Sequence, residues 1–175
     1  MKKVCTVLVM VGLTAAFSGF ASAQDTRESA VANMRKVEAK EMDPGYNKKA
    51  PLAQKLVDDA LAEHPEVILL AIHGGAPKYD IIASNFGRIG KLGDEDDLRC
   101  IHTGKNNLEV DKTGKHFEAE IPLKDKAGKT VGALGVVFNY KPGDDKKALE
   151  QTAIQIGNEM TAKIATSNSL FGPAS

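Results

Sequence analysis

The run Val67-Ile68-Leu69-Leu70-Ala71-Ile72 decides the fold of this chain. Every residue in it is apolar, a pattern typical of a strand in the middle of a sheet that is covered on both faces. Gly74-Gly75-Ala76-Pro77 follows as a turn, and Tyr79 to Ser84 has the composition of a second strand. Together they predict an antiparallel hairpin within a larger sheet.

Three further strands are predicted toward the C-terminus, over Asn107–Asp111, His116–Leu123 and Thr130–Tyr140. The segments between them are short and contain turn residues, so the three strands form an antiparallel meander. In the middle strand, apolar residues alternate with polar and charged ones, which indicates one buried face and one wetter face.

Helices are predicted before, between and after these strands. Pro51 suits the first position of a helix that runs to about Glu63, where a residue preceding proline ends it. Asp94 caps a short helix that Gly104 stops. A closing helix is predicted from Asp145 to about Thr166, with apolar residues on one stripe. The resulting class is α+β.

The ends of the chain differ from this central part. Residues 24–41 are polar with a weak apolar stripe at helical spacing, which predicts an amphipathic helix that docks on another surface. The last residues carry no periodic pattern, and we expect them to be frayed. We therefore divide the chain into an export signal (1–23), an N-terminal helix and turn (24–49), an α+β domain (50–167) and a flexible tail (168–175).

The first residues have the pattern of a secretory signal peptide. Lys2 and Lys3 supply a positive start, Val4 to Phe20 is almost wholly apolar, and Ala21-Ser22-Ala23 matches a small-x-small cleavage site. A membrane anchor is the alternative, but the apolar run is short for a bilayer and contains glycine and serine. We expect cleavage before Gln24, a periplasmic product, and membrane contact only through the transient signal.

Charge and cysteine content exclude several classes of function. The chain has 23 Lys and Arg against 23 Asp and Glu, and loss of the signal leaves a slight acidic excess. Such a balance predicts no nucleic-acid partner. Of the 2 cysteines, Cys5 leaves with the signal, so Cys100 cannot form an internal disulfide. We interpret Cys100 as a buried structural thiol rather than a nucleophile.

Two short motifs resemble the extracytoplasmic Cache domains, which are secreted relatives of the PAS sensor fold. Residues 81–85 followed by Arg88-Ile89-Gly90-Lys91 look like the second strand and the following turn of that family. Residues 117–123, with Asp125, Gly128 and then residues 131–136, look like its final hairpin. The resemblance covers roughly residues 51–140.

The resemblance implies a five-stranded antiparallel sheet whose first strand is central and lies beside the last. It also implies a small-molecule pocket between the sheet and the crossing segment. Arg88 and Lys91 would then pair with an anionic ligand, unless they only balance the acidic run 94–97 on the surface. The residues expected to bind the ligand are Tyr79, Ser84, Asn85, Arg88, Lys91, His102, Phe117 and Glu118.

Such domains are usually ligand sensors, but this sequence offers no cytoplasmic signalling module of its own. The chain is therefore expected to be a sensor-like binding protein that passes its result to another protein. The alternative is an accessory protein that docks on a membrane receptor or transporter in the periplasm through its N-terminal helix.

Signatures of chemistry are weak. The 4 histidines have no spacing that places two ligands on one helix face, so we predict no metal and no cofactor, although His73 and His102 leave a haem or metal carrier as a minor alternative. Glu118 and Glu120 share one face of a strand, where a solvated surface is more common than an acid and base pair. No catalytic triad, phosphate loop or dinucleotide motif occurs, so we expect no enzyme.

Overall fold

The computed structural model describes residues 24–174, so the export signal expected over residues 1–23 lies outside the described residues. Within the described part of the chain, no helix is both long enough and apolar enough to cross a membrane. In chain order the elements are α1 (Arg27–Asn33), the 3-10 helix η1 (Ala39–Glu41), α2 (Pro51–Glu63), β1 (Val67–Gly74), β2 (Asp80–Ser84), α3 (Glu95–Thr103), β3 (Asn107–Val110), β4 (His116–Lys124), β5 (Thr130–Asn139), α4 (Lys146–Thr161) and the 3-10 helix η2 (Ser167–Phe171).

The strands form a single five-stranded sheet in the order β2-β1-β5-β4-β3. Every neighbouring pair is antiparallel. The first strand lies between the second and the last, as expected, and all eight of its residues are buried. The α+β fold with a five-stranded antiparallel sheet is therefore confirmed.

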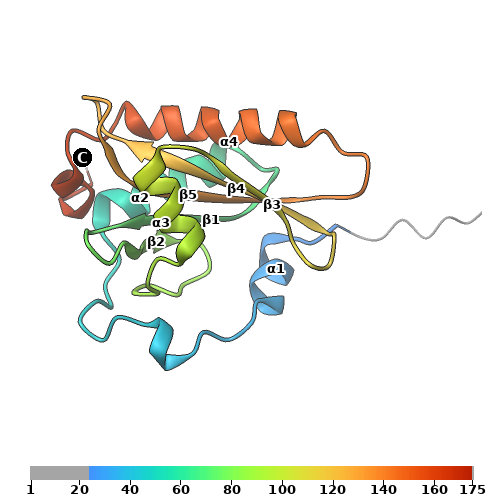
Figure 1. The fold of residues 1–175 in the computed structure, drawn as a ribbon, viewed down its shortest axis with the longest axis horizontal. Helices are drawn as coiled ribbons and strands as arrows, with labels where there is room; N and C mark the ends of the chain where they lie inside the picture. The colour runs from blue at the N-terminus through green and yellow to red at the C-terminus, as the bar shows by residue number, and fades with distance from the viewer. Residues whose placement is uncertain (1–23, 175) are drawn as a thin grey trace, which may run out of the picture.

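One face of the sheet carries the main hydrophobic core. Helices α2 and α4 pack there, and Figure 1 shows α4 running along the length of the sheet. Leu56, Leu70, Phe117, Leu134 and Ile156 are among the fully buried side chains of this layer. Alternate residues of each strand point into it, which leaves the other residues for the opposite face.

On the opposite face, helices cover the sheet at two places. Ala30 of α1 packs on Ile68 and Leu69 of β1. Cys100 and Ile101 of α3 pack on Ala133 of β5. Both helices are short, so the part of the sheet between them is left to loops and to solvent.

The N-terminal segment is less helical than predicted. Helix α1 spans only Arg27–Asn33, and the chain then runs extended to η1 and forms an isolated bridge between Met42 and Lys91. A polar helix with one weak apolar stripe buries little surface, so packing adds little to its stability. Contacts with the domain decide its length instead: the Arg27 guanidinium donates to the carbonyls of Leu61, His64 and Val67.

The C-terminal segment also differs from the prediction. Helix α4 ends at Thr161 rather than near Thr166, and the tail expected to be frayed contains η2. Leu170 of η2 is fully buried in the main core beside α2. Burying a leucine stabilises by about 2 kcal/mol, and Phe171 adds an edge-to-face contact with Tyr46, so these two apolar side chains dock the tail.

Candidate functional site

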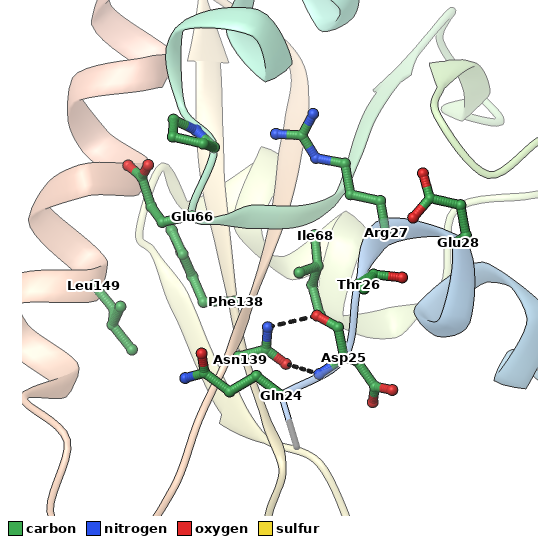
Figure 2. A pocket seen from close by; sticks show the side chains of 11 residues that line it. Gln24, Asp25, Thr26, Arg27, Glu28, Glu66, Ile68, Phe138, Asn139 and Leu149 are labelled. Carbon is green, nitrogen blue, oxygen red and sulfur yellow. Dashed lines mark hydrogen bonds between the residues drawn. The ribbon is translucent and has the colours of Figure 1, made fainter.

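Several hollows lie along the N-terminal segment, and the first is closed by contacts of that segment itself. It has a volume of about 460 Å³ and lies between residues 24–28, β5 and the start of α4. Figure 2 shows the Asp25 backbone joined to the Asn139 amide, with N–O distances of 2.9 and 2.8 Å. Among the residues that line this hollow, Arg27 is the one with a positive charge, and its guanidinium donates hydrogen bonds to backbone carbonyls. The polar groups of this hollow therefore hold residues 24–28 against the domain and are not free to bind a ligand.

The second hollow, which we call the sheet cavity, lies over the uncovered part of the sheet between the end of α1 and the start of α3. Its volume is about 350 Å³, at the small end of the roughly 300–1,000 Å³ typical of ligand pockets. Its floor comes from three strands in register. Leu69, Val137 and Glu118 form one row, and Ala71, Gly135 and Glu120 form the next.

The floor is open because Gly135 has no side chain in the middle of it. A Cβ atom at this position would lie 3.7 Å from Oε1 of Glu118. A larger side chain would therefore project into the floor of the cavity beside Glu118. Gly135 lies within β5 and not in a turn, so its missing side chain matters for the space above the sheet.

One end of the cavity, the arginine end, combines apolar side chains with two guanidinium groups. Met34 and Phe86 line it together with Arg35 and Arg88. Arg88 lies 5.9 Å from the centre of the Phe86 ring and donates to the Arg35 carbonyl oxygen. Partial burial and the neighbouring Arg35 lower the pKa of Arg88, although a guanidinium stays protonated in proteins. Because the Arg35 guanidinium is already paired with the Glu41 carboxylate, Arg88 is the cation that an anionic group entering here would meet.

The other end, the acidic end, collects carboxylates against one imidazole. Asp94, Asp97 and Glu120 each place an oxygen within 4.8 Å of the others. Nε2 of His73 lies 3.4 Å from Oδ1 of Asp97, and Nζ of Lys91 lies 3.1 Å from Oδ2 of Asp94. Asp97 and Glu120 are 2% and 7% exposed, so their carboxyl groups are almost fully removed from solvent.

Burial and mutual repulsion hold protons in this cluster. Burial, with Asp94 next to it, raises the pKa of Asp97 to about 7. Burial and Asp97 raise the pKa of Glu120 to about 9. At the centre of the floor, the surrounding walls and Asp94 raise the pKa of Glu118 to about 7, although its side chain is open to the cavity. Burial lowers the pKa of His73 to about 4, so its ring is neutral.

Three of the predicted binding residues, Arg88, Lys91 and Glu118, line the sheet cavity. Lys91 is paired with Asp94, as the surface-balance alternative expected, but it is only 8% exposed and so lies inside the wall of the cavity. The structure therefore brings residues from the loop before α3 and from β4 to the same hollow of the sheet.

The other five predicted residues are not among those lining this cavity. Asn85 fixes the edge of β1 through Leu70 N–H and the Ile68 carbonyl, and the Ser84 hydroxyl donates to the Gly87 carbonyl. Tyr79 and His102 meet edge to face, with ring centres 6.1 Å apart. Phe117 is buried in the main core on the far face of the sheet, because strand residues alternate between faces.

Several residues that line the sheet cavity were not predicted from the sequence. Asp97 reads as the third residue of a capped helix, and the structure does contain that capping box with Asp94. Glu120 reads as one residue of a solvated strand face, yet it is buried. His73 appears only as the end of a core strand. The signal that joins them is tertiary: α3 begins directly above the second row of the floor.

Comparisons with known proteins support the fold. No protein-family model matches the chain, and no curated protein gives a significant match. The chain is similar to the crystal structure of the A. aeolicus nlh2 GAF domain in an inactive state, with a TM-score of 0.50 and 19% identity over 62% of this chain and 80% of that one.

Two further similar structures are more distant. One is a putative GAF sensor protein from Burkholderia vietnamiensis (TM-score 0.47, 11% identity, 67% of this chain and 76% of that one). The other is a type II free methionine-R-sulfoxide reductase from Thermoplasma acidophilum (TM-score 0.44, 12% identity, 64% and 92%). Neither is close enough to bear on function. The likeness to the first of these structures shows that the chain has an α+β fold similar to that of a GAF domain.

Proposed function

We propose that this protein is a periplasmic, sensor-like binding protein of the Cache type, exported by its signal peptide, without catalytic activity, and that its ligand occupies the sheet cavity. The observation that carries the proposal is the uncovered centre of the sheet between α1 and α3, where the floor is open at Gly135 and charged groups converge. Small-molecule sites are usually concave and largely apolar with a few placed polar groups, and this cavity shares the concave form but carries more charged groups.

The charges of the lining indicate the class of ligand. The acidic residues Asp94, Asp96, Asp97, Glu109, Asp111, Glu118 and Glu120 outnumber the basic residues Arg35, Arg88 and Lys91. Even when Asp97, Glu118 and Glu120 hold protons, four carboxylates remain against three basic side chains, so a purely anionic ligand, as Arg88 and Lys91 alone suggest, would be repelled. We therefore propose a small molecule that carries one anionic and one cationic group, with the anion at Arg88 and the cation at Glu118.

The two groups are placed to hold such a ligand across the floor. Arg88 stands at the arginine end beside Phe86, and Glu118 lies in the row of Leu69 and Val137. A planar guanidinium binds a carboxylate through two parallel hydrogen bonds. The apolar side chains between them would contact the body of the ligand.

A thermal-shift screen tests this proposal. Amino acids, organic acids and purines are added in turn to the purified protein, and we expect at least one zwitterionic compound to raise Tm. A ligand at a hundred times its Kd stabilises by about 2.7 kcal/mol. Arg88→Gln should abolish the shift, whereas Lys126→Gln, which removes a positive charge from the exposed β4–β5 turn, should retain it. Absence of any shift, or an undiminished shift in Arg88→Gln, would refute the proposal.

The alternative of an accessory protein that docks through its N-terminal helix gains less support. The apolar side of α1 is packed against β1 of its own sheet, and Ala30 is buried there. Three backbone carbonyls hold Arg27 in place. A partner that took α1 would first have to detach it from these contacts.

A further inference from the structure

We propose that the acidic end of the sheet cavity binds one hard divalent cation through Asp97, Glu120 and Asp94. The site is separate from the ligand contacts at Arg88 and Glu118, and it stands or falls independently of them. An unpartnered carboxylate oxygen, the spacing of the oxygens, the orientation of His73 and the chemistry of the donor set support it.

The first observation is Oε2 of Glu120. It is buried and has no hydrogen-bond partner among residues 24–174, in a residue that is 7% exposed. A buried acceptor without a partner costs about 1–3 kcal/mol, and more when it is charged. Glu120 lies on the floor of the cavity, and one of its carboxylate oxygens belongs to the cluster with Asp94 and Asp97. A cation at the centre of that cluster would satisfy it.

The spacing of the three carboxylates suits an ion. Their nearest oxygens lie within 4.8 Å of one another. Oxygens on opposite sides of a bound calcium ion are about 4.6–5.2 Å apart, and those around magnesium about 4.2 Å or less. Small side-chain rotations would therefore close the group around an ion without movement of the backbone.

The hydrogen bonds of the cluster leave room for this role. Asp94 and Asp97 form the capping box of α3, in which one oxygen of each accepts the backbone N–H of the other residue. A carboxylate oxygen has more than one lone pair, so capping and coordination are compatible. Capping also fixes both side chains, but it does not account for Glu120 on β4.

His73 lies next to the cluster with Nε2 turned toward Asp97, although it does not belong to the group of three carboxylates whose oxygens lie within 4.8 Å of one another. Its Nδ1 lies 3.2 Å from the Tyr79 carbonyl oxygen, which can only accept, so the proton of the neutral ring is on Nδ1. The lone pair of Nε2 then faces Oδ1 of Asp97 at 3.4 Å. A histidine that donates one ring nitrogen to a backbone carbonyl and turns the other inward is the common arrangement in metal sites.

Lys91 fills part of the electrostatic role that the ion would take. Its ammonium lies 3.1 Å from Oδ2 of Asp94 and 3.5 Å from the Leu92 carbonyl, at the outer side of the cluster. An incoming cation would be repelled by it. Removal of this charge should therefore strengthen metal binding, which is the opposite of the effect expected if Lys91 were only a structural partner.

The donor set defines the class of ion. Carboxylates with one imidazole nearby suit Mg²⁺, Ca²⁺ and Mn²⁺, and the absence of thiolate at the cluster disfavours soft metals; the Cys100 thiol points at the Glu120 carbonyl instead. Mn²⁺ is the most useful probe, because it shares oxygen ligands with the other two ions and accepts imidazole.

Titration calorimetry and manganese paramagnetic resonance test the site. The purified protein is treated with chelator, dialysed at pH 8 and titrated separately with MnCl₂, CaCl₂ and MgCl₂. We expect saturable binding of one ion per chain by at least one of them. Glu120→Gln should weaken that binding at least tenfold, Lys91→Gln should strengthen it, and Glu109→Gln, an exposed carboxylate of the same cavity, should change it less than twofold.

Each variant distinguishes a specific cation site from general attraction to acidic groups. Glu120→Gln keeps the size of the side chain and replaces a carboxyl group whose pKa is about 9 with a neutral amide, so circular dichroism should show an intact fold. Absence of saturable binding by all three ions overturns the proposal. So does equal weakening by Glu120→Gln and Glu109→Gln, which would indicate diffuse attraction to an acidic surface. An unchanged affinity in Glu120→Gln would also overturn it.

Discussion

His116 on β4 joins Asp25 at the start of the N-terminal segment to Asp111 in the β3–β4 turn. Its Nε2 lies 3.0 Å from Oδ2 of Asp25, and its Nδ1 lies 2.9 Å from Oδ2 of Asp111. The residue opposite His116 on β5 is Asn139, whose amide holds the Asp25 backbone. Two paired residues of neighbouring strands therefore fix the point from which α1 runs to the sheet cavity.

His116→Gln should loosen this attachment. The imidazole contacts the two carboxylates through its two ring nitrogens, and the single amide group of glutamine cannot reach both. At least one hydrogen bond is therefore lost, which costs about 1–2 kcal/mol of stability. We expect lower protection of the amides in α1 in hydrogen exchange, with little change in β1. His102→Gln, an exposed histidine at the end of α3, is the control. Equal protection of α1 in both variants would mean that the imidazole does not hold the segment.

Asp80→Asn should stabilise the protein at pH 8 and not at pH 3. Oδ1 of Asp80 is buried without a hydrogen-bond partner in the described chain, and burial together with Asp43 raises its pKa to about 6. An acid whose pKa is higher in the folded state than in the unfolded state loses stability as pH rises from about 4 to 6. Asparagine removes the charge, so the gain should be about 1–2 kcal/mol above pH 7. Denaturant unfolding at both pH values measures it, and an equal gain at pH 3 would contradict the assignment.

Gly90→Ala should cost far more stability than Gly114→Ala. Both glycines have positive φ, +89° and +71°, a region in which an L-residue costs roughly 1 kcal/mol. A Cβ at Gly90 would also lie 2.1 Å from the Tyr46 carbonyl oxygen, whereas nothing lies within 4 Å of one at Gly114. Thermal unfolding should give a Tm loss for Gly90→Ala at least twice that for Gly114→Ala. Similar losses would show that the 43–46 segment yields easily.

Leu170→Ala should destabilise the domain although it lies near the C-terminus. Its side chain is fully buried against α2, and truncation of a buried leucine costs about 2–5 kcal/mol. Leu108→Ala on β3 is the matched control, because that leucine is 43% exposed. Urea unfolding compares the two. A loss for Leu170→Ala no larger than that for Leu108→Ala would mean that η2 is detached in solution.

Cys100 should react with thiol reagents only when the domain unfolds. The side chain is 1% exposed, and burial, followed by the nearby Glu120, raises its pKa to about 12. Only the thiolate reacts, so labelling with a disulfide reagent at pH 8 should be slow in buffer and fast in concentrated guanidinium chloride. Rapid labelling of the folded protein would contradict this burial.

The secondary structure was largely predictable because local chemistry decides it. Pro51 begins α2, the acidic pair Asp94 and Asp97 forms the capping box of α3, and Gly104 ends that helix with φ of +66°. Predictions failed where the pattern was weak. The 24–41 segment and the tail have few apolar residues, and their conformations depend on Arg27 and Leu170, single side chains that find partners far away in the chain.

The candidate site was predictable only in part. Arg88, Lys91 and Glu118 could be expected from the resemblance and the pattern of the strands, and they do line the sheet cavity. Phe117 could have been excluded from the same face as Glu118, because neighbouring strand residues point to opposite sides of a sheet. Asp97, Glu120 and His73 could not have been joined by spacing, since they belong to three elements with other roles.

The sequence by itself determined the antiparallel sheet around residues 67–72, the helices that cap and close it, and the burial of Cys100, because apolar period, capping and turn chemistry act over a few neighbouring residues. Only the tertiary structure decided which face of the sheet stays uncovered and which carboxylates share that space. Those outcomes follow from the lengths of α1 and α3, the missing side chain at Gly135 and the register of β4 against β5, all of which are set by packing between distant parts of the chain.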